Sequence, residues 1–318
     1  MKDCIRAGIP CFVWGSPGIG KSDIIRQVAA EEGVDLIDWR APLHDPTDLM
    51  GIPHVEGDTC KWTVPDFLPR SGKGIFFMDE FPNAVPLMQV ACLQLVLDRR
   101  IGNYKLPDGW VVVAAGNRDT DRAYVNRLST AQGSRFAHVQ KIEVNLECWV
   151  EWALGHNIRP EVIAFLRWRP DLLNAFDPSR NDNAYPCPRT WAMLSKLLDQ
   201  APAPDYEFEA ISGIVGEGAA TEFLGFLRIY RDLPDIDNII ANPTTSDVPK
   251  DVNVLYALCG ALSRKVTAQN AQAALAYAGR LQGEFSVLLV KDIVRLQPDL
   301  LKSKAFITWG LEHQDILL

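Results

Sequence analysis

The chain lacks any long apolar run, and this absence excludes a membrane-spanning structure. Its longest uncharged apolar stretches fall far short of the roughly 20 residues that a membrane-spanning helix needs. The N-terminus also lacks the basic segment followed by an apolar segment that marks a signal peptide. We therefore expect a cytoplasmic protein that does not contact a membrane.

Paired cysteines and an excess of positive charge are missing as well. Several of the seven cysteines lie in apolar runs, as buried thiols do. The set includes no CxxC pair, which indicates reduced cysteines: Cys4, Cys11, Cys60, Cys92, Cys148, Cys187 and Cys259. The five histidines show no metal-ligand spacing. A net charge of −8 argues against a general nucleic-acid binder, although a local basic surface is compatible with it.

A complete G-x-x-x-x-G-K-[ST] sequence occupies residues 15–22, between an apolar strand at 11–14 and a helix at 22–32 that Gly33 can cap. Strand, glycine-rich turn and helix are the order that a phosphate-binding loop requires, because the loop N–H groups and the helix N-terminus face the phosphates. The lysine reaches the terminal phosphates and the serine hydroxyl binds magnesium. The predicted nucleotide-binding residues are Gly15, Ser16, Pro17, Gly18, Ile19, Gly20, Lys21 and Ser22.

Strands alternate with helices in the first half of the chain. Further strands are predicted at 36–39, 74–78, 110–115 and 139–144, the last at the side of the sheet, with a helix at 84–97. Beyond about residue 146 only helical patterns and turn signals follow. The prediction is an α/β fold: a parallel-sheet core at 1–146, a helical lid at 147–241 and a helical C-terminal extension at 242–318.

Polar residues follow two of the predicted strands. Asp79 and Glu80 end the strand at 74–78, where Asp79 would bind magnesium together with Ser22, and Glu80 could polarise a water for attack on the γ-phosphate. Asn117 follows the strand at 110–115 and could bind both that phosphate and the water. The competing interpretation places all three in ordinary surface turns.

The order of these motifs resembles the AAA+ ATPases, and most of all their MoxR-like, dynein-related branch. The resemblance covers roughly residues 8–235. It includes an insertion in the second helix (45–53 and 61–69), a hairpin before the fourth strand (99–109), an arginine-finger motif (132–136) and a lid motif (187–191). It implies a P-loop core with a helical lid, ATP and Mg²⁺ as cofactors, and a hexameric ring.

The resemblance also implies roles for two arginines. Arg189 would act on the nucleotide of its own chain, and Arg135 on the nucleotide of a neighbouring subunit, since a fixed guanidinium stabilises phosphoryl transfer. Arg127 is an alternative finger, and a surface salt bridge is the alternative role for each arginine. Trp62 lies in the insertion, where it could grip an unfolded segment near the ring's pore or pack on its own domain.

A ring-forming ATPase that remodels a partner protein is therefore the leading expectation. MoxR-like proteins resemble chaperones whose partner carries a von Willebrand A-type domain, so the resemblance implies that partner class. A nucleic-acid motor or restriction-type translocase subunit is the alternative, and the acidic charge balance argues against it. A non-catalytic scaffold gated by nucleotide is the third, and the intact Lys21, Asp79, Glu80 and Asn117 argue against that one.

Overall fold

The computed structural model describes residues 1–121, 133–180 and 182–312. The chain divides into two compact units, one formed by Met1–Glu143 with Phe176–Asn181 and the other by Val144–Ala175 with Asp182–Leu318. Among the described residues, no helix is both long and apolar enough to cross a membrane.

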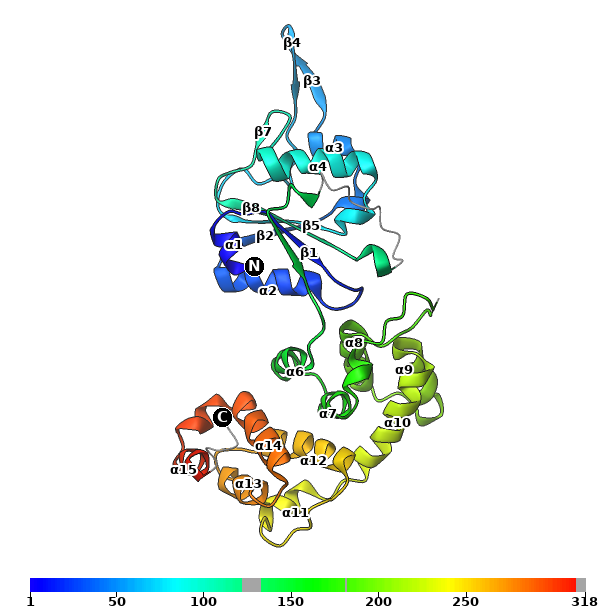
Figure 1. Ribbon diagram of the computed structural model, residues 1–318, viewed down its shortest axis with the longest axis vertical. Coiled ribbons are helices and arrows are strands. Elements are labelled where there is room, and N and C mark those ends of the chain that lie inside the picture. Colours follow the sequence, from blue (N-terminus) through cyan, green and yellow to red (C-terminus); the bar gives the residue numbers. More distant parts are fainter. Residues whose placement is uncertain (122–132, 181, 313–318) are drawn as a thin grey trace. The chain divides into compact units, whose positions relative to one another are not determined.

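A parallel sheet of five strands forms the centre of the first unit (Figure 1). The strand order is β2-β5-β8-β1-β9, and every neighbouring pair is parallel. The strands are β1 (Cys11–Trp14), β2 (Asp35–Arg40), β5 (Gly74–Asp79), β8 (Trp110–Gly116) and β9 (His138–Lys141). Each predicted strand is confirmed, with a start within two residues of the predicted one. Strand β9 lies at the edge of the sheet, as predicted, and ends three residues before its predicted end.

Helices cover both faces of this sheet. Helix α4 (Pro86–Asp98) lies on one face, and α1 (Lys2–Arg6) and α2 (Lys21–Glu32) lie on the other (Figure 1). Because side chains alternate along a strand, Phe12 packs on the α4 side, whereas Cys11 and Val13 pack on the α2 side. Helix α2 ends as predicted at Gly33, whose φ of 61° favours glycine.

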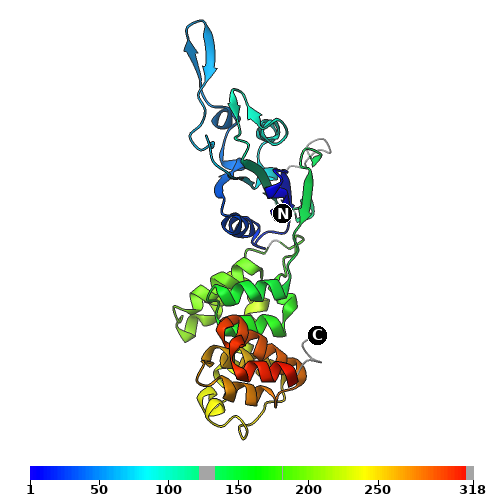
Figure 2. The ribbon, with the colours of Figure 1, turned by 90° about the vertical axis from the view of Figure 1, so that its left-hand side faces the viewer.

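Shorter elements of the first unit lie at the ends of the strands. They are the 3₁₀ helices η1 (Ala41–Leu43), η2 (Phe81–Asn83) and η3 (Asp119–Asp121), helix α3 (Pro46–Met50), the hairpin β3 (Pro53–Glu56)–β4 (Thr59–Trp62) and the hairpin β6 (Arg100–Ile101)–β7 (Tyr104–Lys105). The β3–β4 hairpin protrudes from the sheet in both ribbon views (Figure 2). Tyr104 anchors the β6–β7 hairpin, because its hydroxyl donates a hydrogen bond of 2.7 Å to the Pro69 carbonyl oxygen. Burial raises the pKa of this hydroxyl to about 12.

The described part of the second unit is helical throughout. Its helices are α6 (Leu146–Gly155), α7 (Pro160–Trp168), α8 (Pro188–Leu198), α9 (Glu207–Val215), α10 (Glu217–Arg231), α11 (Ile236–Ala241), α12 (Val252–Lys265), α13 (Ala271–Ala278), α14 (Gly283–Leu296) and α15 (Lys304–Glu312), with 3₁₀ turns η4 (Pro170–Leu173), η5 (Pro204–Tyr206) and η6 (Pro298–Lys302). The predicted fold class, a parallel α/β core followed by helices, is confirmed.

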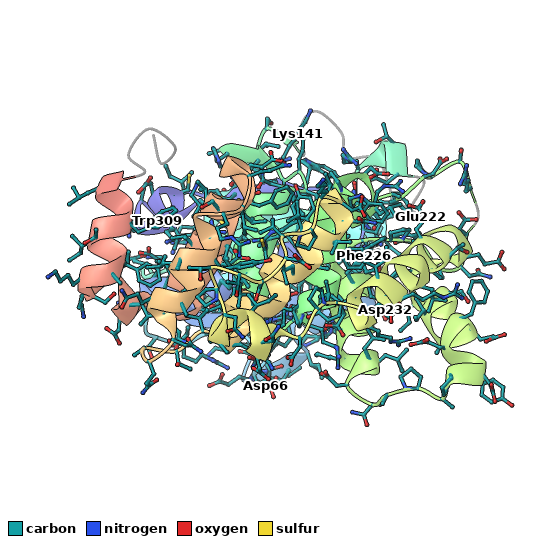
Figure 3. The ribbon with its side chains drawn as sticks, turned by 90° about the horizontal axis from the view of Figure 1, so that it is seen from below. Asp66, Lys141, Glu222, Phe226, Asp232 and Trp309 are labelled. Carbon is teal, nitrogen blue, oxygen red and sulfur yellow. The ribbon has the colours of Figure 1, made fainter. Side chains whose placement is uncertain are left out.

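Two hydrophobic clusters fill the second unit. Phe165, Trp191 and Phe226 belong to the first cluster, and Tyr277 and Trp309 to the second. Figure 3 labels Phe226 on α10 and Trp309 on α15, at opposite sides of the unit. The predicted boundary between residues 241 and 242 falls directly after α11, whose buried residues already belong to the second cluster. The division into three domains stays a prediction.

Candidate active site

The glycine-rich loop joins β1 to α2 at the C-terminal edge of the sheet. Gly18 and Gly20 adopt φ values of 77° and 88°, which residues with a side chain rarely adopt. A Cβ atom on Gly15 would lie 2.4 Å from Ile19 Cδ1 and 3.1 Å from the Ile142 carbonyl oxygen, so a side chain there would displace the end of Ile19. The backbone of the loop therefore has the curvature that a phosphate cradle requires.

Lys21 is the first residue of α2, and its side chain reaches back across the phosphate loop. Its Nζ donates hydrogen bonds to the carbonyl oxygens of Gly15 at 2.8 Å and Ser16 at 2.9 Å. A third bond, of 2.8 Å, goes to Oδ1 of Asn117. The ammonium group is thus held over the loop, and the structure brings together two predicted site residues that are 96 positions apart.

Ser22 and Asp79, the predicted magnesium ligands, also meet. The Ser22 hydroxyl donates a hydrogen bond of 2.6 Å to Asp79 Oδ2, and Asp79 is largely buried at the end of β5. In the described part of the chain, no group of three His, Cys, Asp or Glu side chains could hold a metal. A cation at Ser22 and Asp79 would therefore need phosphate oxygens and waters as further ligands, an arrangement that suits Mg²⁺.

Glu80 is exposed and its backbone is unusual. It adopts a φ of 53°, in the left-handed region, and its N–H donates to Asp79 Oδ1 at 2.9 Å. Left-handed backbone is unfavourable for a residue with a side chain, and its surroundings must hold it. Gln89, a buried residue that sequence reasoning missed, braces the turn that follows through Nε2, which donates to the carbonyl oxygens of Pro82 and Ala84 at 3.1 Å each.

Gly116 connects this turn to the phosphate loop. Its carbonyl oxygen accepts a hydrogen bond of 3.3 Å from the Gly15 N–H. A Cβ atom on Gly116 would lie 2.4 Å from the Pro82 ring, so the end of β8 packs tightly against the residues after Glu80. Asn117 follows directly, which makes the positions of Asn117 and Glu80 depend on one close contact.

Arg118 is a further residue that sequence reasoning missed. Its guanidinium donates from Nη2 to the Ser16 hydroxyl of the phosphate loop. It also forms an ion pair with the buried carboxylate of Asp121, with 3.2 Å from Nε to Oδ2. The sequence signal was present as an arginine with an aspartate three residues later, directly after Asn117.

Arg135 lies on the face of the sheet that α4 covers. It lines a surface pocket of about 700 Å³ together with residues of α4, among them Val90, Gln94 and Leu97. The neighbouring Phe136 packs in the core against Phe12, at 5.0 Å between ring centroids. The pocket includes no residue of the phosphate loop, and the role of Arg135 stays a prediction.

Arg189 is the arginine of the predicted lid motif. Arg189 is exposed in the first turn of α8 and belongs to the second unit. Its predicted contact with the nucleotide stays a prediction. Arg127 lies outside the described residues.

Comparisons with known proteins give distant similarities only. No protein-family model matches the chain. No curated protein matches it. Among solved structures, RuvB of Thermotoga maritima, a Holliday junction branch migration motor, is 14% identical over 82% of this chain and 77% of that chain, with a TM-score of 0.41. NtrX from Brucella abortus in complex with ADP is 13% identical over 100% of this chain and 66% of that chain, with a TM-score of 0.40. At these values the function has to be argued from the chain's own residues.

Proposed function

We propose that the chain is a Mg²⁺-dependent ATP hydrolase of the AAA+ class, related to its MoxR-like branch. One observation carries the proposal. Hydrogen bonds gather Lys21 with Asn117 and Ser22 with Asp79, so that three separate parts of the sequence meet at one glycine-rich loop. A phosphate loop, a buried strand ending in two carboxylates and an amide beside the lysine are the parts that hydrolysis of a nucleoside triphosphate needs.

Each residue has a role in this proposal. Lys21 and the loop N–H groups bind the phosphates, and Ser22 and Asp79 hold Mg²⁺, which would neutralise charge on the β- and γ-phosphates. Glu80 is the exposed carboxylate next to that site, placed to orient and polarise the attacking water. Asn117 exchanges its bond with Lys21 for bonds to the γ-phosphate and the water.

The wider part of the proposal concerns assembly and substrate. Arg135 supplies the finger to a neighbouring subunit of a hexameric ring in the cytoplasm, and Arg189 senses the nucleotide in its own chain. The ring remodels a protein partner, for which a protein with a von Willebrand A-type domain is the proposed class. Stimulation of ATP hydrolysis by casein, and not by duplex DNA, supports the remodelling role; the reverse result supports a nucleic-acid motor.

Two substitutions test the hydrolase itself. Lys21→Ala removes the cation that contacts the β- and γ-phosphates, so ATP binding measured by calorimetry should be lost. Glu80→Gln keeps size and hydrogen bonding but removes the negative charge, so it should bind ATP and hydrolyse it at least about 100-fold more slowly. Lys196→Ala, at an exposed lysine of α8, is the control and should behave as wild type. Full ATP hydrolysis by Lys21→Ala would contradict the proposal.

A further inference from the structure

Arg118 is held in place from two directions. Asp121 accepts from the Arg118 backbone N–H at 3.1 Å and from Nε at 3.2 Å, and its other oxygen lies 3.1 Å from Nη2. The side chain of Asp121 is only 3% exposed, so its carboxylate is a fixed anchor. From there the guanidinium extends to the hydroxyl of Ser16 in the phosphate loop.

Ser16 lies between two cations. Its carbonyl oxygen accepts from Lys21 Nζ at 2.9 Å, and its hydroxyl accepts from Arg118. In loops of this type the lysine marks the β- and γ-phosphates, whereas the glycine backbone and the helix N-terminus hold the α- and β-phosphates. Arg118 therefore approaches the loop beside the lysine, at the side where the terminal phosphate binds.

The guanidinium keeps the capacity to bind a further anion. The side chain of Arg118 is 41% exposed, and its Nη1 makes no hydrogen bond to any described residue. Arginine carries five N–H donors in a rigid planar group, which suits the oxygens of a phosphate. Asp121 thus fixes one edge of the Arg118 guanidinium, and the Nη1 group on the other edge can donate to a phosphate oxygen.

We propose that Arg118 is a further cation of the nucleotide site, supplied by the same chain, which binds the γ-phosphate of ATP, and that Asp121 is its positioning residue. The inference rests on the proposed nucleotide site and adds a residue to it. It means that a single subunit already distinguishes ATP from ADP, before any arginine of a neighbour contributes. Loss of Arg118 should therefore change the preference for the triphosphate, and not nucleotide binding in general.

Calorimetric titration of Arg118→Gln with Mg-AMP-PNP and with ADP tests the inference. The glutamine keeps a hydrogen-bond donor but removes the charge. We expect the Kd for AMP-PNP to rise roughly 10- to 100-fold, as for loss of a charge-assisted hydrogen bond, while the Kd for ADP stays within about 2-fold. Arg26→Gln is the matched control, because it removes an exposed arginine of the same unit that pairs with Asp23 and Asp38, and it should leave both Kd values unchanged.

Two more variants separate binding from structure. Asp121→Asn should weaken AMP-PNP binding in the same direction but by less, because Arg118 keeps its charge and loses only its anchor. Arg118→Lys keeps the charge and should retain part of the preference; it also serves as the readout if thermal unfolding shows that Arg118→Gln does not fold. Equal losses for AMP-PNP and ADP, or no loss for either, would overturn the inference while the nucleotide site stands. A wild-type chain that binds neither nucleotide would overturn the proposed function as well.

Discussion

At the scale of single residues, the site depends on close backbone contacts that only certain residues allow. Glu80 has a left-handed backbone, and the turn after it is fixed by Gln89 and by the contact between Pro82 and Gly116. These contacts hold the turn that carries Glu80 against the end of β8, where Asn117 follows. A change of one carbon atom at Gly116 should therefore affect catalysis as well as folding.

Gly116→Ala tests this dependence. The added Cβ would lie 2.4 Å from the Pro82 ring, which cannot rotate away, so the Glu80 turn or the end of β8 must shift. We expect a stability loss of about 1–3 kcal/mol by urea denaturation and a fall in kcat of at least about 10-fold. Gly225→Ala is the control: Gly225 lies inside α10 with open space at its Cβ position, so alanine should stabilise the fold by about 0.5–1 kcal/mol and leave kcat unchanged. Unchanged kcat in Gly116→Ala would show that the contact is not needed for catalysis.

The sequence predicted the site residues that lie within recognisable motifs. It did not predict Gln89 and Arg118, whose roles depend on hydrogen bonds to groups that no motif identifies. Lys21, Ser22, Asp79 and Asn117 follow strands or begin a helix, and the parallel sheet brings such positions to one edge. Gln89 sits inside a helix, where its sequence position says nothing about which carbonyl oxygens it reaches. Arg118 is one residue beyond Asn117, and only the structure shows that Asp121 directs it to Ser16.

At the scale of elements, strong patterns gave the strands and the main helices of the sheet. The run at 11–14 is β1 with the same bounds, and the helix at 22–32 is α2, beginning one residue earlier. The strand order depends on crossovers between distant segments, and no local pattern specifies it. The insertion around Trp62 folds as a short, exposed antiparallel hairpin with Pro53 opposite Trp62, as the proline- and glycine-rich stretches on both sides of it predict.

The β3–β4 hairpin can be tested with two tryptophans. Trp39 is buried in the core and stacks on Phe67 and His44, whereas Trp62 is only partly buried and lies on the exposed hairpin. Trp39→Ala should cost about 3–5 kcal/mol of unfolding free energy, and Trp62→Ala less than about 1 kcal/mol. Trp62→Ala should also reduce the stimulation of ATP hydrolysis by casein. A loss of stability in Trp62→Ala that matches Trp39→Ala would mean that Trp62 packs on its own domain, and the proposed grip on a substrate would fail.

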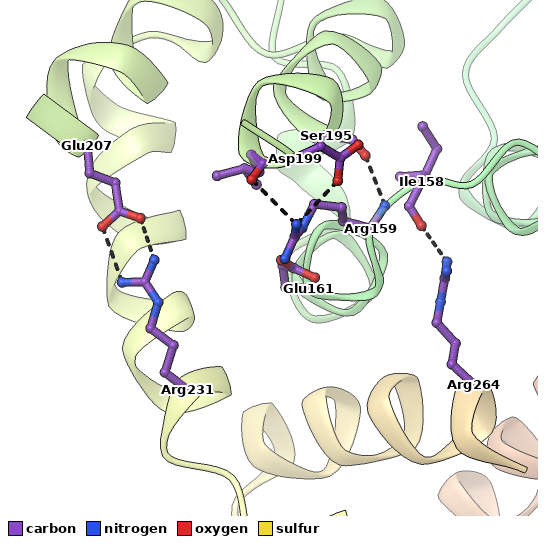
Figure 4. Close-up of polar contacts among 9 residues, drawn as sticks. Ile158, Arg159, Glu161, Ser195, Asp199, Glu207, Arg231 and Arg264 are labelled. Carbon is purple, nitrogen blue, oxygen red and sulfur yellow. Dashed lines mark hydrogen bonds and ion pairs between the residues drawn. The ribbon is translucent and has the colours of Figure 1, made fainter. Parts of the chain in front are cut away.

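At the scale of the whole molecule, a buried ion pair joins two helices within the second unit. Arg167 on α7 and Asp292 on α14 form a buried pair, with 2.7 Å from Nη2 to Oδ1. Figure 4 shows a second group, in which Arg231 binds Glu207 and Arg159 binds Asp199 at 3.2 Å. Breaking the buried Arg167–Asp292 pair would leave an uncompensated charge, so this contact holds α7 against α14, whereas the more exposed pairs contribute little.

Assembly is the property of the whole molecule that the proposed mechanism requires most. If Arg135 completes a neighbour's site, a monomer binds ATP but hydrolyses it slowly, and activity per chain rises with protein concentration. An arginine finger acting in trans contributes roughly 10³–10⁵ to the rate. Arg135→Ala should therefore bind ATP almost normally and lose at least about 10³-fold in kcat.

Mixing variants distinguishes action in trans from a local effect of Arg135. Lys21→Ala has no usable site but an intact Arg135, so mixing it with Arg135→Ala should restore part of the activity. Head-to-tail contacts in a closed ring join one chain's loop to the next chain's finger, which makes such rescue possible. The double variant Lys21→Ala/Arg135→Ala offers neither part, and mixing it with Arg135→Ala should restore nothing. Activity per chain that stays constant on dilution, together with no rescue in the first mixture, would show that Arg135 does not act on a neighbour. Each interface that joins the intact loop of Arg135→Ala to the intact finger of Lys21→Ala would otherwise form a complete site.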